Sequence, residues 1–241
     1  GHNLIFTDTN NNHISFGIEI CEDVWMPVPP STLHALAGAT MLINLSASNE
    51  IVGKSSFRRD MVVMQSAKAI AAYIYASCGV HESTTDLVFS GHSLIAENGT
   101  LLTESPRYTR ENTITYADID IDHIVTDRNR TNSFADNQNM VSMENYRSIP
   151  VTIPTITHKP NKRFVSPTPF LPGDLAKRAA VTEDIFNIQV AGLAKRLESI
   201  NAKSVVLGLS GGLDSTLAFL VCLQVFDTLG LDRKGIYAIT M

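Results

Sequence analysis

Apolar and polar residues alternate along several short stretches of the chain, and this pattern predicts a fold built from both strands and helices. Residues 14–21 alternate and are rich in β-branched side chains, which is typical of a strand. Residues 40–46 form a continuous apolar run, as expected for a strand covered on both faces. Apolar residues recur at helical spacing from Ser55 to about Ala72, and a short buried strand is predicted over residues 72–77.

Turn and breaker residues divide the middle of the chain. Ser31 or Thr32, which follow a run of prolines, are candidate helix caps. The Glu-Asn-Gly sequence at residues 97–99 lies between two alternating runs and predicts a β-hairpin. A further strand is predicted over residues 113–121. Residues 133–178 are rich in Asn, Ser and Pro and poor in periodic pattern, so we interpret them as a long connecting segment.

A strand–helix–strand pattern closes the chain. A helix is predicted over residues 181–200, with Thr182 at its start. Residues 203–212 form a strand-like run that enters a glycine turn, residues 214–230 have a helical pattern, and residues 235–241 are again strand-like. A unit of this kind implies a parallel sheet.

These patterns predict two α/β domains. We expect the first over residues 1–150, a linker over residues 151–178, and the start of the second over residues 179–241. The chain begins and ends inside strand-like runs, so we expect it to be a fragment of a longer protein.

Composition narrows the functional classes. Of 241 residues, 44% are apolar and 18% charged, which fits a globular protein with a core. There are 19 Lys and Arg against 24 Asp and Glu, a net charge of −5, and this balance argues against a nucleic-acid partner. No apolar run is long enough for a membrane span, and no leader pattern opens the chain. The three cysteines are too few for a disulfide framework, so we expect a cytoplasmic protein.

Two local features could carry chemistry. Cys21 ends an apolar strand and is followed by Glu22 and Asp23, a position that can expose a nucleophilic thiol. Judged on local sequence alone, a buried structural cysteine is the more common case. The sequence SGGLDS at residues 210–215 joins a strand to a helix, where glycines and free N–H groups can bind an anion. An ordinary glycine-rich turn is the alternative, and the sequence does not have the Walker A pattern.

The wider context of Cys21 resembles the glutaminase domain of glutamine-dependent NAD synthetases, a branch of the nitrilase superfamily. The segments that carry the resemblance are GIEICEDVWMPVPPS, AGATMLINLSASNEIVGKSSFRRDMV and HESTTDLVFSGHSLIAENGTLL. The resemblance implies that Cys21 attacks the glutamine amide and forms a thioester. It implies that Glu22 and Ser48 contact glutamine and that Trp25 forms an aromatic wall. Lys54 falls where some members have Arg, which keeps the charge but not the bidentate fork.

Nitrilase chemistry also uses a Glu base and a Lys that stabilises the oxyanion, both upstream of the cysteine. Only 20 residues precede Cys21 and none is Lys, so we expect the isolated chain to be inactive. Glu19 is interpreted as a supporting residue rather than the base, and Arg58 and Arg59 as part of a solvated helix face. Six histidines show no metal-ligand spacing and are interpreted as surface or core residues: His13, His34, His81, His92, His123 and His158.

The SGGLDS turn resembles the pyrophosphate-binding loop of the N-type ATP pyrophosphatases, a family that includes NAD synthetases. The resemblance implies ATP as a substrate and Mg²⁺ held with help from Asp214. It also implies that Met241 lies near the adenine. The residues implied to bind phosphate oxygens are Ser210, Gly211, Gly212 and Ser215.

Together the two resemblances imply a fold and a reaction. The fold is α/β: an incomplete nitrilase-like α-β-β-α sandwich, then the first β-α-β unit of a Rossmann-like parallel sheet of the adenine nucleotide alpha-hydrolase type. The reaction converts glutamine, ATP and deamido-NAD to NAD, AMP, pyrophosphate and glutamate, with ammonia channelled between the sites of a homo-oligomer. The alternatives are another glutamine-dependent amidotransferase of the pyrophosphatase group, or a non-catalytic assembly fragment.

Overall fold

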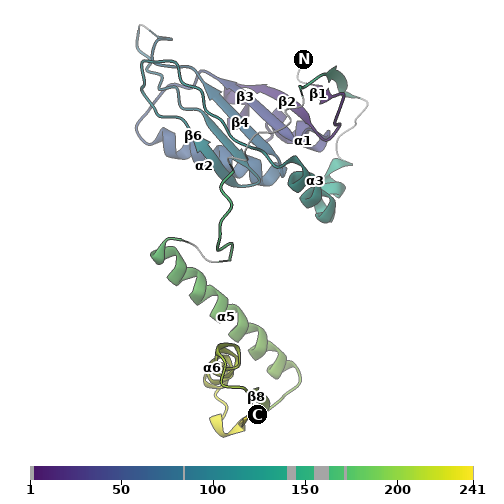
Figure 1. Cartoon of the computed structure of the whole chain (residues 1–241), viewed down its shortest axis with the longest axis vertical. Helices are drawn as coiled ribbons and strands as arrows, with labels where there is room; N and C mark the ends of the chain where they lie inside the picture. The colour runs from purple at the N-terminus through teal and green to yellow at the C-terminus, as the bar shows by residue number, and fades with distance from the viewer. Residues whose placement is uncertain (1–2, 84, 140–144, 155–162, 171–172, 241) are drawn as a thin grey trace. The chain divides into compact units, whose positions relative to one another are not determined.

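The chain is divided into two compact units, Gly1–Phe164 and Val165–Met241. The structure is a computed structural model that describes residues 3–83, 85–139, 145–154, 163–170 and 173–240 (Figure 1). The domain limits expected from sequence, at residues 150 and 179, stay a prediction. None of the helices in the described residues is both long and apolar enough to cross a membrane.

The first unit is built on a mixed sheet with strand order β6-β5-β4-β3-β2-β1-β7. The strands are β1 (Leu4–Asp8), β2 (Ser15–Ile20), β3 (Met41–Ser46), β4 (Ala72–Ser77), β5 (Leu94–Glu97), β6 (Thr100–Glu104) and β7 (Arg147–Val151). β2, β3 and β4 run parallel, and their ends align because Ile20 pairs with Leu45 and Leu45 with Ala76. The carboxyl ends of three parallel strands therefore meet at one edge.

Two helices cover one face of this sheet. α1 (Pro30–Leu36) packs on β2 and β3, and α2 (Lys54–Ala69) packs on β4, β5 and β6 (Figure 1). The side-chain caps predicted at Ser31 and Thr32 are wrong, because α1 starts at Pro30 and Pro29 holds the cap position. A proline needs no hydrogen bond from its nitrogen, so it starts a helix without a capping side chain. Gly17 of β2 has to be glycine, because a Cβ there would lie 2.5 Å from His34 Cγ.

The opposite face of the sheet is apolar and partly open. Ile18, Ile43, Ile74 and Ile95 pair in register across four strands and form one apolar row. Towards the carboxyl end the next row is more open, with Ile20 56% and Leu45 50% exposed. Exposed contiguous apolar surface of this kind is unusual on a soluble monomer.

The hairpin prediction is confirmed and the strand prediction over 113–121 is wrong. β5 and β6 pair antiparallel, and the turn residues Asn98 and Gly99 have φ of 44° and 83°. In the segment expected to be a strand, Asp120 instead caps α3 (Ile121–Arg130) by accepting from the His123 nitrogen at 2.9 Å. The Asp120 backbone nitrogen donates to the Glu97 carboxylate at 2.7 Å. The hydrogen bonds of Asp120 are therefore with the Glu97 side chain and the start of α3, and not with a neighbouring strand.

Arg128 ties α3 to the rest of the unit. Its guanidinium donates to the carbonyl oxygens of Ile70, Ala39 and Ala69 at 2.8–3.0 Å, and it lies 4.8 Å from the ring of Phe134 in α4 (Asn132–Gln138). Burial lowers the pKa of Arg128 to about 10. Because it binds the carbonyl oxygens at the end of α2, this arginine supports the helix that carries Lys54 and Arg58.

The expectation of a connecting segment over 133–178 is wrong in part, because β7, all but the first residue of α4 and the start of the next helix at Leu175 lie within it. β7 adds to the sheet by pairing parallel with β1. It contains Pro150, and proline is tolerated in a strand at the edge of a sheet. The expected parts of this segment at residues 140–144, 155–162 and 171–172 lie outside the described residues.

The second unit contains α5 (Leu175–Ser199), β8 (Val205–Leu209), α6 (Leu213–Thr228), the short turn η3 (Arg233–Gly235) and β9 (Ile236–Thr240). β8 and β9 pair parallel, which confirms the β-α-β prediction. The predicted helix start at Thr182 is wrong. Asp174 caps α5 by accepting from the Ala176 nitrogen, and Thr182 lies inside the helix, where its hydroxyl donates to backbone carbonyls.

Candidate active site

Cys21 lies where β2 ends, and its backbone has the left-handed conformation. Its φ of 49° is uncommon for a residue with a side chain. Such a conformation persists only where the surroundings hold it, and it is enriched in active sites. Here Asn44 Nδ2 donates to the carbonyl oxygen of Cys21 at 3.2 Å. The turn η1 (Cys21–Trp25) then leads the chain away from the sheet, and the thiol stays partly exposed.

The sulfur of Cys21 is in contact with a hydroxyl from the next strand. Ser46 Oγ donates to Cys21 Sγ at 3.4 Å, and the same Oγ lies 2.6 Å from the hydroxyl of Tyr75. Across the described residues, no carboxylate is hydrogen-bonded to this sulfur. The structure therefore places a partly exposed thiol beside a hydroxyl donor, and no group that could act as a general base is among these contacts of the described residues.

Glu19 supports the strand end rather than the sulfur. It is 2% exposed, and its carboxylate accepts from the Ser31 backbone nitrogen at 2.7 Å, from Asn44 Nδ2 at 3.3 Å and from the Tyr73 hydroxyl. Burial and the charge of Glu19 raise the pKa of Tyr73 well above its ordinary value, so the phenol stays a donor. Because Asn44 also binds the Cys21 carbonyl, this network braces the turn.

Glu22 and Trp25 follow Cys21 in η1, and Lys54 is the first residue of α2. The Trp25 ring stacks on Phe57 at 5.5 Å, and Lys54 Nζ lies 5.4 Å from the Trp25 ring. Lys54 Nζ also donates to Asn49 Oδ1 at 2.9 Å. Burial and the charge of Arg58 lower the pKa of Lys54, although Cys21 and Glu22 act in the opposite direction. The structure thus brings an aromatic ring and a cation together, and the cation interacts electrostatically with Cys21 and Glu22.

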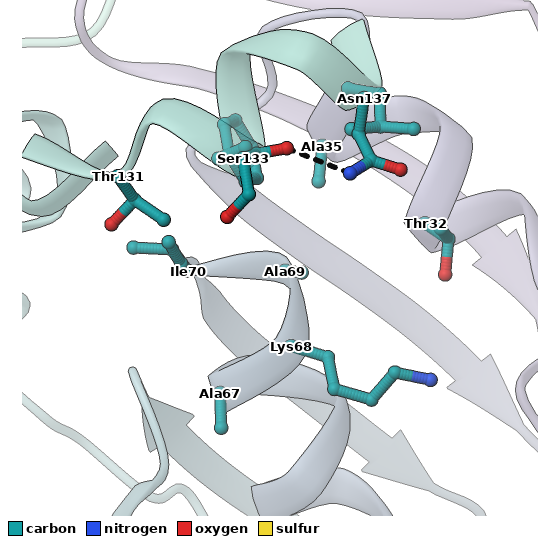
Figure 2. A pocket seen from close by; sticks show the side chains of 11 residues that line it. Thr32, Ala35, Ala67, Lys68, Ala69, Ile70, Thr131, Ser133 and Asn137 are labelled. Carbon is teal, nitrogen blue, oxygen red and sulfur yellow. Dashed lines mark hydrogen bonds between the residues drawn. The ribbon is translucent and has the colours of Figure 1, made fainter. Parts of the chain in front are cut away.

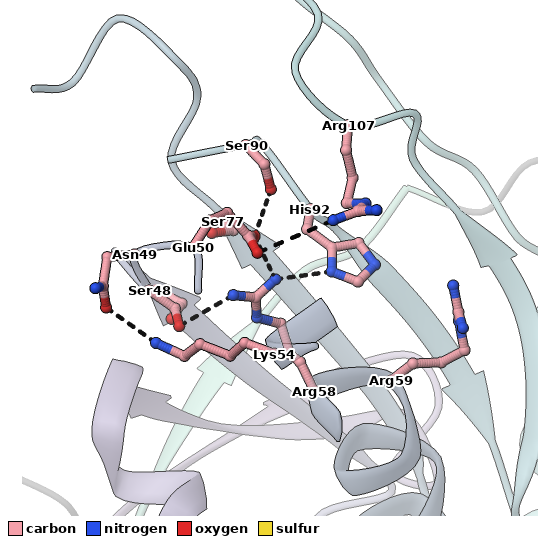
Figure 3. Close-up of polar contacts among 12 residues, drawn as sticks. Ser48, Asn49, Glu50, Lys54, Arg58, Arg59, Ser77, Ser90, His92 and Arg107 are labelled. Atoms are coloured by element: carbon pink, nitrogen blue, oxygen red, sulfur yellow. Dashed lines mark hydrogen bonds and ion pairs between the residues drawn. The ribbon is translucent and has the colours of Figure 1, made fainter. Parts of the chain in front are cut away.

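Ser48 is held by a buried arginine. Arg58 is completely buried, and its two terminal nitrogens donate to Ser48 Oγ at 3.3 Å and to Glu50 Oε1 at 2.7 Å (Figure 3). Burial alone would raise the pKa of Glu50, but hydrogen bonds from Ser90 and Arg58 outweigh it and lower that pKa. One guanidinium therefore fixes both ends of residues 48–50, the loop after β3.

The prediction that Arg58 lies on a solvated helix face was wrong. It shares a face of α2 with the buried residues Val62 and Ser66, one and two turns further on. Arg59, the next residue, is the one that points outward: its side chain is 40% exposed and pairs with Glu104 at 2.6 Å. Helical spacing distinguishes the two arginines, and the charge alone does not.

The contacts of His92 fix its proton position. Its Nδ1 lies 2.8 Å from an Arg58 nitrogen, and a guanidinium can only donate, so Nδ1 must accept. The proton is then on Nε2, which lies 2.7 Å from Glu104 Oε1. Burial lowers the pKa of His92, and the charge of Arg58 adds to this, although Glu104 opposes it. His92 is therefore a neutral link between Arg58 and Glu104.

This neutral histidine predicts that the first unit loses stability in mild acid. The unfolded chain binds a proton at His92 near pH 6.5, while the folded protein resists it, so the free energy of unfolding should fall as the pH drops below about 6.5. The carboxyls of Glu50 and Glu104 have lowered pKa values, so their contribution is lost only below about pH 4.5. We expect a loss of about 1 kcal/mol between pH 7.0 and 5.5.

Urea unfolding at the two pH values, followed by the fluorescence of Trp25, the only tryptophan, would measure this loss. In His92→Gln the amide can accept from Arg58 and donate to Glu104 but does not titrate. The variant should lose most of the pH dependence, and an unchanged dependence would contradict the assignment.

The second unit carries the SGGLDS turn. Gly211 has φ of 83°, and the following Gly212 is the cap residue of α6, so the first N–H groups of this helix have no side-chain cap. Ser210 Oγ lies 3.3 Å from Ser215 Oγ, which places two hydroxyls beside these N–H groups. Asp214 is in the first turn of α6 and is exposed. This arrangement can bind an anion. Met241 lies outside the described residues.

A separate hollow lies at the other end of α2 (Figure 2). It has a volume of about 320 Å³ and is lined by Thr32 and Ala35 of α1, Lys68 and Ile70 near the end of α2, and Asn137 of α4. A helix of 16 residues is about 24 Å long, and Lys54 lies at the opposite end of α2. The hollow is therefore not part of the Cys21 site.

Sequence reasoning missed four residues of the site. Ser46 and Tyr75 are polar positions inside strands, where a hydroxyl on a buried face was a usable signal. The burial of Arg58 could have been predicted from its position four residues before Val62, on the same face of α2. His92 offered no sequence signal beyond its residue type, because its partners lie 12 and 34 residues away.

Comparison with known families shows which family the chain belongs to. A model of the carbon-nitrogen hydrolase family matches residues 4–129, more than half of the chain. The chain belongs to the carbon-nitrogen hydrolase family. That match includes Cys21, Arg58 and the three partners of Arg58, which are Ser48, Glu50 and His92. A model of the NAD synthase family matches residues 185–241, which include the SGGLDS turn. The α/β fold expected from the two resemblances is confirmed.

Several curated relatives carry the name glutamine-dependent NAD(+) synthetase. The one from Mycobacterium leprae is 38% identical over 244 residues, which cover 100% of this chain and 36% of the relative. The one from Thermotoga maritima is 28% identical and covers 100% of this chain and 38% of the relative. This carbon-nitrogen hydrolase chain thus spans little more than a third of the length of these relatives. A solved glutamine-dependent NAD(+) synthetase from Cytophaga hutchinsonii is similar at 23% identity, with a TM-score of 0.39, over 91% of this chain and 26% of that one.

Proposed function

We propose that this chain is part of a glutamine-dependent NAD synthetase. The observation that carries the proposal is the pairing, in one chain, of a thiol held at the carboxyl ends of parallel strands with a glycine-rich anion loop at a helix start. The match of this whole chain to 36% of the length of a relative of that name supports it. Neither site alone distinguishes this function from other amidases or nucleotide-binding proteins.

At the first site, the Cys21 thiolate attacks the carboxamide carbon of glutamine. Ammonia leaves as the thioester forms, and water then hydrolyses the thioester to release glutamate. Trp25 lines the side of the substrate, and Glu22, Ser48 and Lys54 bind its polar end groups. Nitrilase chemistry also needs a general base and an oxyanion donor, and neither is among the hydrogen-bond partners of the Cys21 sulfur in the described residues.

At the second site, ATP binds with its pyrophosphate against the SGGLDS turn. The backbone N–H groups after Gly212 and the hydroxyls of Ser210 and Ser215 hold phosphate oxygens. Asp214 is an exposed carboxylate beside hydroxyl oxygens, a hard donor set that suits Mg²⁺ shared with the phosphates. The deamido-NAD carboxylate attacks the α-phosphorus, pyrophosphate leaves, and ammonia then displaces AMP to give NAD. As the resemblance implies, Met241 lies near the adenine.

The arrangement of the whole enzyme is also a proposal. Ammonia passes from the first site to the second inside a cytoplasmic homo-oligomer, because protonated ammonium in bulk water is not a nucleophile. The half-buried apolar row of Ile18, Ile43, Ile74 and Ile95, with the exposed Ile20 and Leu45 in the next row, supports a further protein layer over this sheet face, as in an α-β-β-α sandwich. The domain limits at residues 150 and 179 belong to the same proposal.

An isotope experiment tests the function. The longer enzyme that contains this chain is incubated with ATP, Mg²⁺, deamido-NAD and glutamine labelled with ¹⁵N in its amide, and NAD is analysed by mass spectrometry. We expect ¹⁵N in the NAD carboxamide, and excess unlabelled ammonia should dilute the label only weakly if the transfer is internal. Glutamate release without labelled NAD would overturn the NAD assignment and favour another amidotransferase of the pyrophosphatase group.

A further inference from the structure

The sulfur of Cys21 is linked to a short chain of buried hydroxyls. Ser46 is 8% exposed at the end of β3, and its Oγ donates to Cys21 Sγ at 3.4 Å. Tyr75 is 1% exposed in β4, and its hydroxyl lies 2.6 Å from Ser46 Oγ, within the usual range for an O–H···O bond. Ser46 and Tyr75 come from the neighbouring parallel strands β3 and β4, and Cys21 directly follows β2 on the other side of β3, so the sheet fixes the spacing of the three residues.

The direction of this chain follows from counting protons. A serine hydroxyl has one proton, so when Ser46 donates to the sulfur its oxygen must accept from Tyr75. Burial raises the pKa of Tyr75, although Ser46 opposes this, so the phenol keeps its proton under working conditions. Tyr75 is then a donor, Ser46 is oriented by it, and the remaining proton points to the sulfur.

The charged groups around the sulfur show why the hydroxyl of Ser46 matters for a thiolate at Cys21. The carboxylates in this region are those of Glu22 and Asp23 in η1, Glu19 in β2 and Glu50 after β3. The cations are Lys54 and Arg58 of α2. The other titratable groups nearby are Tyr75 and Cys78. Burial lowers the pKa of Lys54, and Arg58 is committed to Ser48, Glu50 and His92. A neutral hydroxyl donor stabilises a thiolate without depending on either cation.

We propose that Ser46 is a catalytic residue that stabilises the thiolate of Cys21 by donating a hydrogen bond to it, and that Tyr75 is the positioning residue that orients Ser46. The proposal rests on Cys21 being the nucleophile, as in the proposed function. It adds two residues from β3 and β4 to a site whose base and oxyanion donor lie elsewhere.

The test measures how fast iodoacetamide alkylates Cys21 in the longer enzyme, because only the thiolate reacts. The rate is followed for the Cys21 peptide by mass spectrometry at pH 7 and pH 10. At pH 7, Ser46→Ala and Tyr75→Phe should react about tenfold and severalfold more slowly than the unmodified enzyme, the size expected for a hydrogen bond to a charged group. At pH 10 all three should react at similar rates, since the thiolate then forms without help.

Two further variants separate this role from a merely structural one. Ser46→Thr keeps the hydroxyl and should restore most of the rate at pH 7. Tyr73→Phe removes a buried phenol hydroxyl from the same strand, but one that is bonded to Glu19 and not to Ser46. Any effect of Tyr73→Phe through the Glu19 network should change the rates at pH 7 and pH 10 alike, so the ratio of the pH 7 rate to the pH 10 rate should stay unchanged.

The outcomes are distinct. The proposal is overturned if Ser46→Ala and Tyr75→Phe slow alkylation equally at pH 7 and pH 10. It is also overturned if the ratio of the pH 7 rate to the pH 10 rate is the same in these variants as in the unmodified enzyme. If the unmodified enzyme does not hydrolyse glutamine but the rate ratios change as expected, the proposed function fails and the role of Ser46 stands. If glutamine is hydrolysed and the ratios do not change, only the present inference fails.

Discussion

Replacing Cys21 with alanine should abolish glutamine-dependent NAD formation by the longer enzyme, with a loss of about 10³-fold or more, the size seen when a catalytic nucleophile is removed. Without the thiol no thioester forms, and no ammonia is released. The anion loop after β8 belongs to the other compact unit and does not use this residue. NAD formation from added ammonium salt should therefore stay within a fewfold of the unmodified enzyme. Both rates are measured by NAD release from deamido-NAD and ATP.

The control for this prediction is Cys78→Ala. Cys78 lies just after β4 at the same edge of the sheet, and burial raises the pKa of its thiol, which disfavours the reactive thiolate. This variant should keep glutamine-dependent activity. If Cys21→Ala retained a tenth of the glutamine-dependent rate, Cys21 would not be the nucleophile. If it lost both rates together, the effect would be on folding rather than on glutamine chemistry.

The features that sequence predicted well are encoded by neighbouring residues. The end of β2 at Cys21, the Asn98-Gly99 turn and the strand–glycine–helix pattern around Gly211 each depend on a few contiguous positions. Backbone preferences act at this range, because glycine or asparagine at a left-handed position needs no distant partner. The local chemistry of both proposed sites was therefore visible without a structure.

The features that sequence missed depend on distant partners. A helix arginine is normally solvated, because burial of its charge has a large cost unless partners offset it. For Arg58 those partners are Ser48, Glu50 and His92, up to 34 residues away. In the same way β7 forms only because β1 lies beside it, about 140 residues earlier in the chain. No local pattern reports either pairing.

Removing Arg58 should have the largest effect on stability. In Arg58→Met the helix face keeps a long side chain, but Glu50 remains as a buried carboxylate without its main cation. Breaking a buried ion pair from one side costs about 3–5 kcal/mol, and we expect this loss in the free energy of unfolding measured by urea and Trp25 fluorescence. The loss should shrink as the pH falls towards 5, because an unpaired buried carboxyl has a raised pKa and takes up a proton in the folded state.

Two variants test that this loss comes from the unpaired charge and not from the lost side chain. The matched control is Arg59→Met on the adjacent, outward-facing position, where a partly exposed pair with Glu104 should contribute about 1 kcal/mol or less. The double variant Arg58→Met with Glu50→Gln removes both charges and should recover a large part of the stability. If the double variant were as unstable as Arg58→Met alone, the hydrogen bonds to Ser48 and His92 would be the main contribution of Arg58. The loop after β3 would then depend on shape and hydrogen bonding rather than on charge.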